Sequence, residues 1–119
     1  DVGVIQKNDV LMLISNSGIT KEVVMLIDLA RSLYSDLPII SLTGNREGKL
    51  PEVANISLIT GKPEEICPLG LTPTTSTTAM TVIGDLLVVA LMKKIGLTKE
   101  DYAKRHHSGY LGSKARENG

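Results

Sequence analysis

Val10-Leu11-Met12-Leu13-Ile14-Ser15-Asn16-Ser17-Gly18-Ile19-Thr20 is the stretch of the 119-residue sequence that decides the fold. Its first five residues form a continuous apolar run, typical of a parallel strand covered on both faces. A turn follows in which Gly18 permits a tight bend, and an amphipathic helix pattern begins after it. The hydroxyls of Ser15, Ser17 and Thr20 therefore converge with free N–H groups at a helix N-terminus, which predicts a phosphate site. The local pattern fits equally well an ordinary helix cap at Thr20 and a turn stabilised by Ser17.

Strand and helix patterns alternate along the chain. Apolar residues recur at helical spacing from Val23 to Leu33, and this helix is predicted to end at residues 34–36, before Pro38. Further strands are predicted over Ile39–Leu42 and Ile56–Ile59. This order predicts an α/β fold, a parallel sheet with flanking helices and right-handed crossovers. Because three strands make a thin sheet and the chain begins without Met, we expect a strand–helix unit to precede it.

The second half of the chain begins with a loop of unusual length. Residues 62–73 carry turn residues without periodicity, which marks a candidate functional element. A long helix is predicted to begin at residues 74–76 and to stop at Gly96. Thr98 should open a short helix through a variant capping box, and the polar tail 109–119 should fray or dock on a partner subunit. The buried side of the long helix is predicted to comprise Ala79, Val82, Ile83, Leu86, Leu87, Ala90 and Leu91.

Polar loops follow all three predicted strands. Ligands of parallel sheets bind beyond the carboxyl ends of the strands, so the turns 15–20 and 43–45 and the loop 61–73 should line one rim. A run of hydroxyl side chains opens the long helix and is predicted to face the same rim, where it could bind an oxygen-rich ligand. Ordinary N-capping would account for one or two of its members, which are Thr72, Thr74, Thr75, Ser76, Thr77 and Thr78.

Composition argues against several classes of protein. The 13 basic and 13 acidic residues balance, and three tyrosines are the only aromatic residues, which argues against a nucleic-acid binder. The longest apolar segment, Val82–Met92, is shorter than the roughly 20 residues of a membrane span. Cys67 is the only cysteine, and neither a CxxC nor an HExxH spacing occurs, so no required metal is predicted. We expect a cytoplasmic protein.

Three motifs resemble a known family. They are Ser15–Glu22, the run Glu65–Thr78, and Glu100–Ala103 followed by His106 and Leu111-Gly112. Together they resemble the sugar isomerase (SIS) domain of D-arabinose-5-phosphate isomerases over essentially the whole chain. The first motif marks any SIS domain, whereas the second is close to diagnostic for this branch.

The resemblance implies both a fold and an activity. It implies a flavodoxin-like three-layer sandwich, of which residues 1–119 would be a single SIS domain lacking its N-terminal strand–helix unit. It also implies interconversion of D-ribulose 5-phosphate and D-arabinose 5-phosphate, without a cofactor, in a homo-oligomer built as a dimer of dimers. The product would feed synthesis of the eight-carbon acid Kdo for lipopolysaccharide or capsule.

Site residues are carried over from the family to matching positions. The resemblance implies catalytic roles for Glu22, Glu65 and His106, since isomerisation through an enediol needs a base and an acid–base group for the sugar oxygens. Which group takes which proton stays open. The implied substrate ligands are Ser15, Asn16, Ser17, Gly18, Thr20, Thr75 and Ser76.

Each catalytic candidate also fits a structural role. The helix dipole alone favours Glu22 in a first turn, and Glu65 could be a solvated loop charge beside Glu64. His106 and His107 could be a surface pair, and neighbouring histidines on a helix point about 100° apart and chelate poorly.

His106 is placed by resemblance alone. The family typically has His-Pro-Gly-Gly where this chain has His106-His107-Ser108-Gly109, and the family's upstream turn with its catalytic lysine has no counterpart here. We expect His106 to complete the site of a neighbouring subunit. The alternative function is a non-catalytic, phosphosugar-binding regulatory SIS domain, which would keep the turn 15–20 without needing Glu65 and His106 together.

Overall fold

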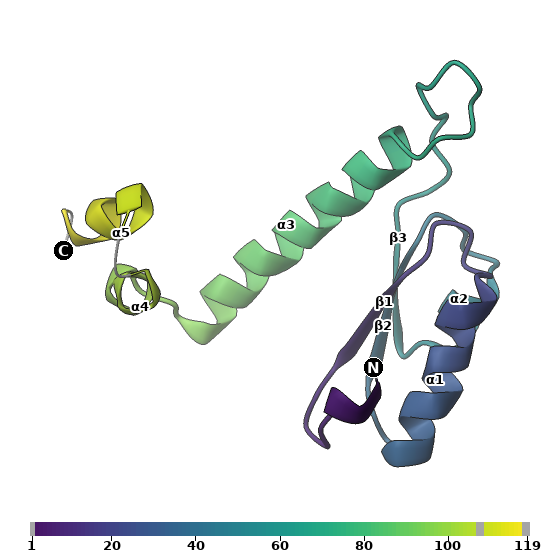
Figure 1. The fold of residues 1–119 in the computed structure, drawn as a ribbon, viewed down its shortest axis with the longest axis horizontal. Helices are drawn as coiled ribbons and strands as arrows, with labels where there is room; N and C mark the ends of the chain where they lie inside the picture. Colours follow the sequence, from purple (N-terminus) through teal and green to yellow (C-terminus); the bar gives the residue numbers. More distant parts are fainter. Residues whose placement is uncertain (1, 107–108, 118–119) are drawn as a thin grey trace. The chain divides into compact units, whose positions relative to one another are not determined.

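The computed structural model describes residues 2–106 and 109–117, and it divides into two compact units, residues 1–83 and 84–119. The first unit holds a parallel sheet with the strand order β1-β2-β3 (Figure 1). The strands are β1 (Leu11–Ile14), β2 (Ile39–Thr43) and β3 (Ile56–Ile59). The predicted parallel sheet is therefore confirmed, with strand ends within one residue of those expected.

Two helices cover one face of this sheet. Helix α1 (Lys21–Leu33) and the short helix α2 (Lys49–Val53) lie on the same side in Figure 1. Their side chains Ile27 and Leu50 form the core with Leu13 and Ile39 of the strands, and all four are 7% exposed or less. The Arg31 guanidinium donates to the Val53 carbonyl oxygen at 3.0 Å, which joins the end of α1 to α2.

The opposite face of the sheet is apolar but remains exposed in this unit. Met12 and Ile14 of β1 are 36% and 55% exposed, and Ile56 of β3 is 58% exposed. The expectation that the first strand is covered on both faces is wrong for this unit, because α1 and α2 both pack on one side.

Two short elements of the first unit were not predicted. The 3-10 helix η1 (Val2–Val4) and helix α2 are too short to show a helical repeat, and α2 contains Pro51. Among the described residues, those between β3 and the next helix form neither helix nor strand, so the long loop is confirmed.

Helix α3 (Thr75–Ile95) begins and ends where the sequence predicted. Its predicted buried side is wrong as a statement about this structure: Ser76 is the only buried residue among the described residues of α3. Val82, Leu86, Ala90 and Leu91 are exposed, and the remaining members of the predicted set, Ala79, Ile83 and Leu87, are half-buried. Periodicity identifies an apolar stripe, but a stripe is buried only where another element packs on it.

Helix α3 is also long and apolar enough to cross a membrane, with a mean hydropathy of 1.6 over 18 residues. The sequence estimate was shorter because it counted only the apolar residues from Val82 to Met92. The core helix of a soluble protein has the same length and composition, so these two properties do not identify a membrane span.

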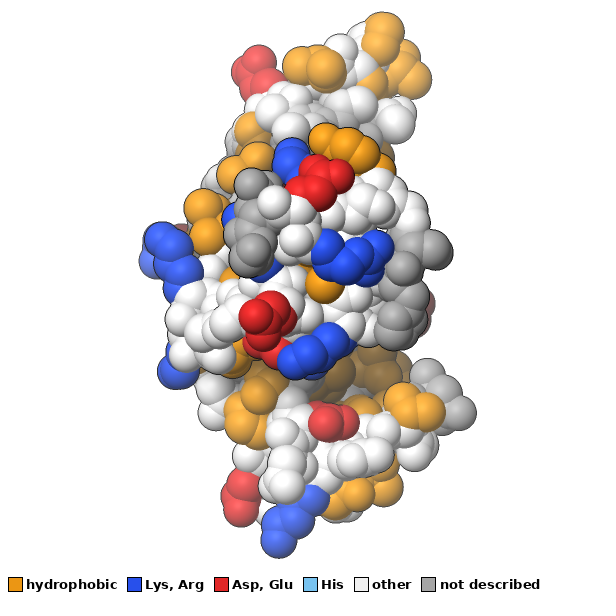
Figure 2. Space-filling model, turned by 90° about the vertical axis from the view of Figure 1, so that its left-hand side faces the viewer, with side chains coloured by type: hydrophobic (Ala, Val, Ile, Leu, Met, Phe, Trp, Pro, Cys, Tyr) orange, Lys and Arg blue, Asp and Glu red, His pale blue; other side chains and the backbone are white. Residues whose placement is uncertain are grey.

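The second unit ends in two short helices that contact each other, α4 (Lys99–Arg105) and α5 (Gly109–Arg116). The predicted capping box is confirmed: Thr98 Oγ1 accepts from Asp101 N at 3.1 Å, and Asp101 Oδ2 accepts from Thr98 N at 3.3 Å. The tail is helical over residues 109–116, so the expectation that it frays is wrong there, and docking on a partner subunit stays a prediction. The His106 carbonyl lies close to Gly112, where a Cβ would not fit. Basic and acidic side chains are interspersed on the face seen in Figure 2.

Candidate functional site

The turn after β1 gathers three hydroxyl groups. Ser15 Oγ lies 2.8 Å from Thr20 Oγ1 and 3.5 Å from Ser17 Oγ, and the Ser17 and Thr20 hydroxyls are 3.4 Å apart. Thr20 is the N-cap residue of α1, but its side chain makes no capping hydrogen bond. The ordinary-cap interpretation of Thr20 is therefore wrong, whereas Ser17 does stabilise the turn by accepting from Ile19 N at 3.3 Å.

Gly18 holds this turn against the next loop. Its φ of 67° lies in the left-handed region, and a Cβ on it would lie 2.9 Å from Thr43 Oγ1 and 3.3 Å from Gly48 Cα. The Gly18 carbonyl accepts from Leu50 N at 2.8 Å, and the Ser17 carbonyl accepts from Asn45 Nδ2 at 3.0 Å. The predicted need for glycine at position 18 is thus confirmed, and the neighbouring turn holds the hydroxyl cluster in place.

Loops after all three strands line one pocket of about 450 Å³. As predicted, the turns after β1 and β2 and the loop after β3 meet at the carboxyl edge of the sheet. The lining residues are Asn16, Ser17, Ile19, Asn45, Lys62, Pro63, Glu65, Gly70 and Leu71.

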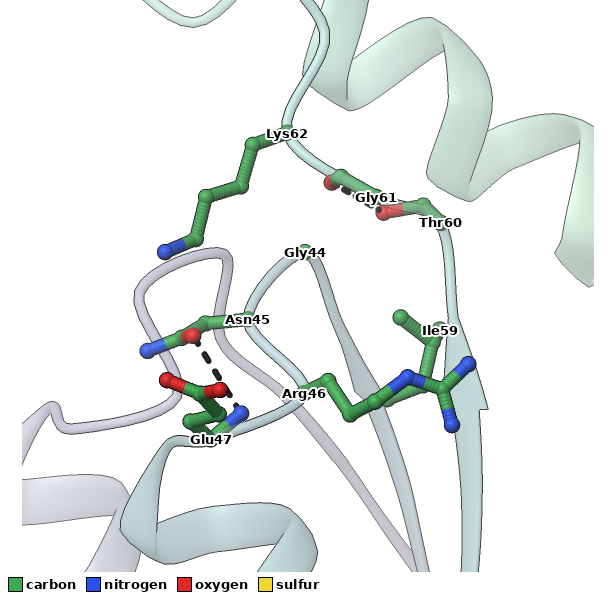
Figure 3. A pocket seen from close by; sticks show the side chains of 8 residues that line it. All are labelled: Gly44, Asn45, Arg46, Glu47, Ile59, Thr60, Gly61 and Lys62. Atoms are coloured by element: carbon green, nitrogen blue, oxygen red, sulfur yellow. Dashed lines mark hydrogen bonds between the residues drawn. The ribbon is translucent and has the colours of Figure 1, made fainter.

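Asn45 and Lys62 also line a second pocket, of about 580 Å³, between the loops that follow β2 and β3. Figure 3 shows Lys62 extending toward Asn45, which accepts from Glu47 N at 3.3 Å. Lys62 belongs to the loop 61–73 that the sequence predicted to line the rim, but it was not singled out as a site residue. The available signal was its position three residues after the end of β3, because residues that directly follow parallel strands lie at the rim.

Glu65 is held by the start of α3. Its Oε2 accepts from Thr74 N at 2.7 Å, from Thr74 Oγ1 at 2.9 Å and from Ser76 N at 3.3 Å. The nearby Ser76 hydroxyl, together with these Thr74 and Ser76 donors, lowers the Glu65 pKa to about 2 against an opposing effect of partial desolvation. Glu65 is therefore not the solvated loop charge of the structural alternative.

The other hydroxyls of α3 differ in their surroundings. Thr75 Oγ1 and Ser76 Oγ are buried and make no geometrically satisfactory hydrogen bond within the described part of the chain. Thr77 and Thr78 both donate to the Thr74 carbonyl, at 2.8 Å and 3.1 Å. Thr77 and Thr78 therefore share one backbone acceptor, and no member of the predicted hydroxyl run is among the residues that line the pocket.

Two catalytic candidates lie outside the pocket lining. Glu22 is exposed in the first turn of α1. His106 belongs to the second unit, where its ring stacks on Tyr102 with centroids 4.3 Å apart. His107 lies outside the described residues, and no group of three or more metal-ligating side chains occurs among residues 2–106 and 109–117.

Comparisons with known proteins agree with this geometry. The arabinose 5-phosphate isomerase KdsD of Salmonella typhi is 45% identical over 114 residues, which are 96% of this chain and 34% of that protein. The chain thus spans about a third of the length of this curated relative. A Bacteroides fragilis structure assigned as a phosphosugar isomerase involved in capsule formation superposes with a TM-score of 0.89 at 54% identity, covering 92% of this chain and 57% of that one.

A third relative carries a bound ligand. The structure of Escherichia coli CFT073 c3406 in complex with arabinose 5-phosphate has a TM-score of 0.82 at 31% identity and covers 89% of this chain and 55% of that one. The model of the SIS domain family matches residues 1–90, a region that contains the sheet, the hydroxyl turn and the Glu65 loop. The chain belongs to the SIS domain family.

Proposed function

We propose that this domain catalyses an aldose–ketose isomerisation of a pentose 5-phosphate, interconverting D-ribulose 5-phosphate and D-arabinose 5-phosphate. The observation that carries the proposal is the pocket in which Ser17 of the hydroxyl turn and Glu65 of the loop after β3 face a common space. The activity named for the Salmonella relative and the arabinose 5-phosphate bound to the E. coli structure support the substrate class.

The hydroxyl turn is proposed to bind the phosphate. Ser15, Ser17 and Thr20 can each donate to a phosphate oxygen, and the N-terminus of α1 adds roughly half a positive charge. Asn16 and Gly18 shape the same turn, and Thr75 and Ser76 are proposed to contact the sugar. A crystal soaked with arabinose 5-phosphate should show the phosphate within hydrogen-bond distance of Ser15 or Ser17, and a phosphate bound only elsewhere would refute this assignment.

Glu22 and His106 are the proposed proton-transfer groups. Isomerisation through an enediol needs groups whose protonation changes near the working pH, and an imidazole meets this requirement directly. Replacement of His106 by Ala should lower kcat far more than it weakens substrate binding. An unchanged kcat would reject a catalytic role for His106.

We further propose that the domain works as a cytoplasmic homo-oligomer, a dimer of dimers, whose product feeds Kdo synthesis for lipopolysaccharide or capsule. The exposed apolar side chains of α3, such as Leu86 at 60%, support burial against other copies of the chain. His106 is then proposed to complete a neighbouring subunit's site. Hybrids of a Ser17→Ala protein and a His106→Ala protein should regain partial activity; verified hybrids that stay inactive would overturn the shared site.

A further inference from the structure

We propose that Glu65 and Thr74 form a clamp that closes the loop after β3 and positions its residues at the pocket, so that Glu65 is a positioning residue and not the base of the reaction. This inference rests on the proposed isomerase function for its kinetic test. The clamp itself is a property of the fold and can be tested without activity.

The clamp joins Glu65, inside the loop, to Thr74 at the end of the loop that leads into α3. Glu65 Oε2 accepts from both the backbone N–H and the hydroxyl of Thr74, at 2.7 Å and 2.9 Å. Thr74 Oγ1 in turn accepts from Ile66 N at 3.1 Å. The Thr74 hydroxyl therefore donates to Glu65 and accepts from Ile66, which closes the ten-residue segment 65–74 through one side chain.

A second set of contacts orders the interior of the same loop. Cys67 Sγ accepts from Leu71 N at 3.2 Å and from Thr72 N at 3.1 Å. Gly70 then turns the chain with a φ of 63°, and its N–H donates to the Cys67 carbonyl at 2.9 Å. Gly70 and Leu71, which line the pocket, thus owe their positions to a loop that Glu65 and Thr74 hold shut at its base.

The same contacts make Glu65 a poor base. The nearby Ser76 hydroxyl and three hydrogen bonds to one oxygen stabilise the ionised carboxylate, and its pKa falls to about 2. An effective general base has a pKa near the working pH, because it must take up a proton readily in the transition state. A carboxylate committed to three donors at a helix start is instead suited to holding structure, as a charged N-cap does.

Four variants of the full-length protein distinguish a positioning role of Glu65 from a role as the base. Glu65→Gln weakens the clamp and removes the charge; Thr74→Val removes the hydroxyl but leaves Glu65 in place. Thr74→Ser restores the hydroxyl, and Glu64→Gln is the matched control, since Glu64 is exposed and makes no hydrogen bond among the described residues. Activity is measured as kcat and KM for arabinose 5-phosphate from pH 5 to 9.

The clamp predicts a shared pattern. Glu65→Gln and Thr74→Val should lower kcat/KM by similar factors, on the order of 10²-fold for a displacement of the loop by about 1 Å. Thr74→Ser and Glu64→Gln should keep the parent kcat/KM. The double variant Glu65→Gln/Thr74→Val should lose no more kcat/KM than the poorer of its two single variants, because both act on one clamp. The limbs of the pH–rate profile should stay at the same pH in all variants. If Glu65→Gln alone abolishes kcat and an acidic limb while Thr74→Val stays near the parent, Glu65 transfers the proton and the proposal is wrong.

Hydrogen exchange tests the clamp independently of catalysis. Backbone amides of the non-proline residues in the segment 66–72 should exchange at least tenfold faster in Glu65→Gln and Thr74→Val than in the parent, while those of the sheet should not change. Unchanged exchange in both variants would overturn the clamp even in an active enzyme. Faster exchange in a protein that isomerises no sugar phosphate would leave the clamp standing and reject the proposed function.

Discussion

Alanine at position 18 tests how tightly the hydroxyl turn is set against the neighbouring loop. The φ of Gly18 is 67°, and left-handed backbone costs a residue with a Cβ about 1–2 kcal/mol. The added Cβ would also lie 2.9 Å from the hydroxyl of Thr43, which is fully buried, and 3.3 Å from the Gly48 backbone. Neither neighbour is a flexible side-chain end, so the crowding adds a cost of about 1–3 kcal/mol. Gly18→Ala should therefore lower the free energy of unfolding by about 2–5 kcal/mol.

Gly61 supplies the matched control. Its φ of 81° is also left-handed, but a Cβ there would meet no heavy atom within 4 Å. Gly61→Ala should lower the free energy of unfolding by about 1–2 kcal/mol, from backbone strain alone. The assay is equilibrium urea denaturation of both variants and the parent, with the midpoint and the slope compared. Equal losses in the two variants would refute the reasoning, because they would show that the contacts of Gly18 with Thr43 and Gly48 cost nothing.

Three further outcomes follow from the packing and the charges. Leu50→Ala, at a fully buried core position, should cost about 2–5 kcal/mol of unfolding free energy in urea denaturation, whereas Leu71→Ala, which is 78% exposed, should stay within about 0.5 kcal/mol of the parent. The Glu65 pKa is lowered from 4.5 to about 2, so the stability that its carboxylate adds is complete above pH 4.5 and is lost as the pH falls toward 2. The thermal unfolding temperature of Glu65→Gln should therefore depend less on pH across this window than that of the parent. Equal pH dependence in the two proteins would contradict the lowered pKa. Asn45→Ala removes the hydrogen bond from the Asn45 side chain to the Ser17 carbonyl, which is worth about 1–1.5 kcal/mol. Arabinose 5-phosphate should therefore bind about fivefold to tenfold more weakly, as measured by calorimetry. An unchanged affinity would count against the idea that Asn45 anchors the hydroxyl turn.

Local patterns in the sequence were sufficient for the order of the main elements and for the rim. A continuous apolar run, a helical repeat and a turn signal each depend on neighbours within a few residues, so β1 to β3, α1, α3 and the capping box of α4 could be predicted. The meeting of three post-strand loops at one edge also followed, because parallel strands all end on the same side. Helices as short as α2 carry too few residues to show a repeat, which is why α2 was missed.

The candidate site could be described only by combining the sequence with the tertiary structure. Ser15, Ser17 and Gly18 could be chosen from the sequence because their turn is local, whereas the resemblance to a family supplied Glu65 without its surroundings. Only the tertiary structure showed that Glu65 accepts from Thr74, nine residues away, since that contact depends on the path of a loop without periodicity. The tertiary structure also decided which side chains are buried. The apolar stripe of α3 can be recognised in the sequence, but whether it is buried depends on which surfaces pack against it.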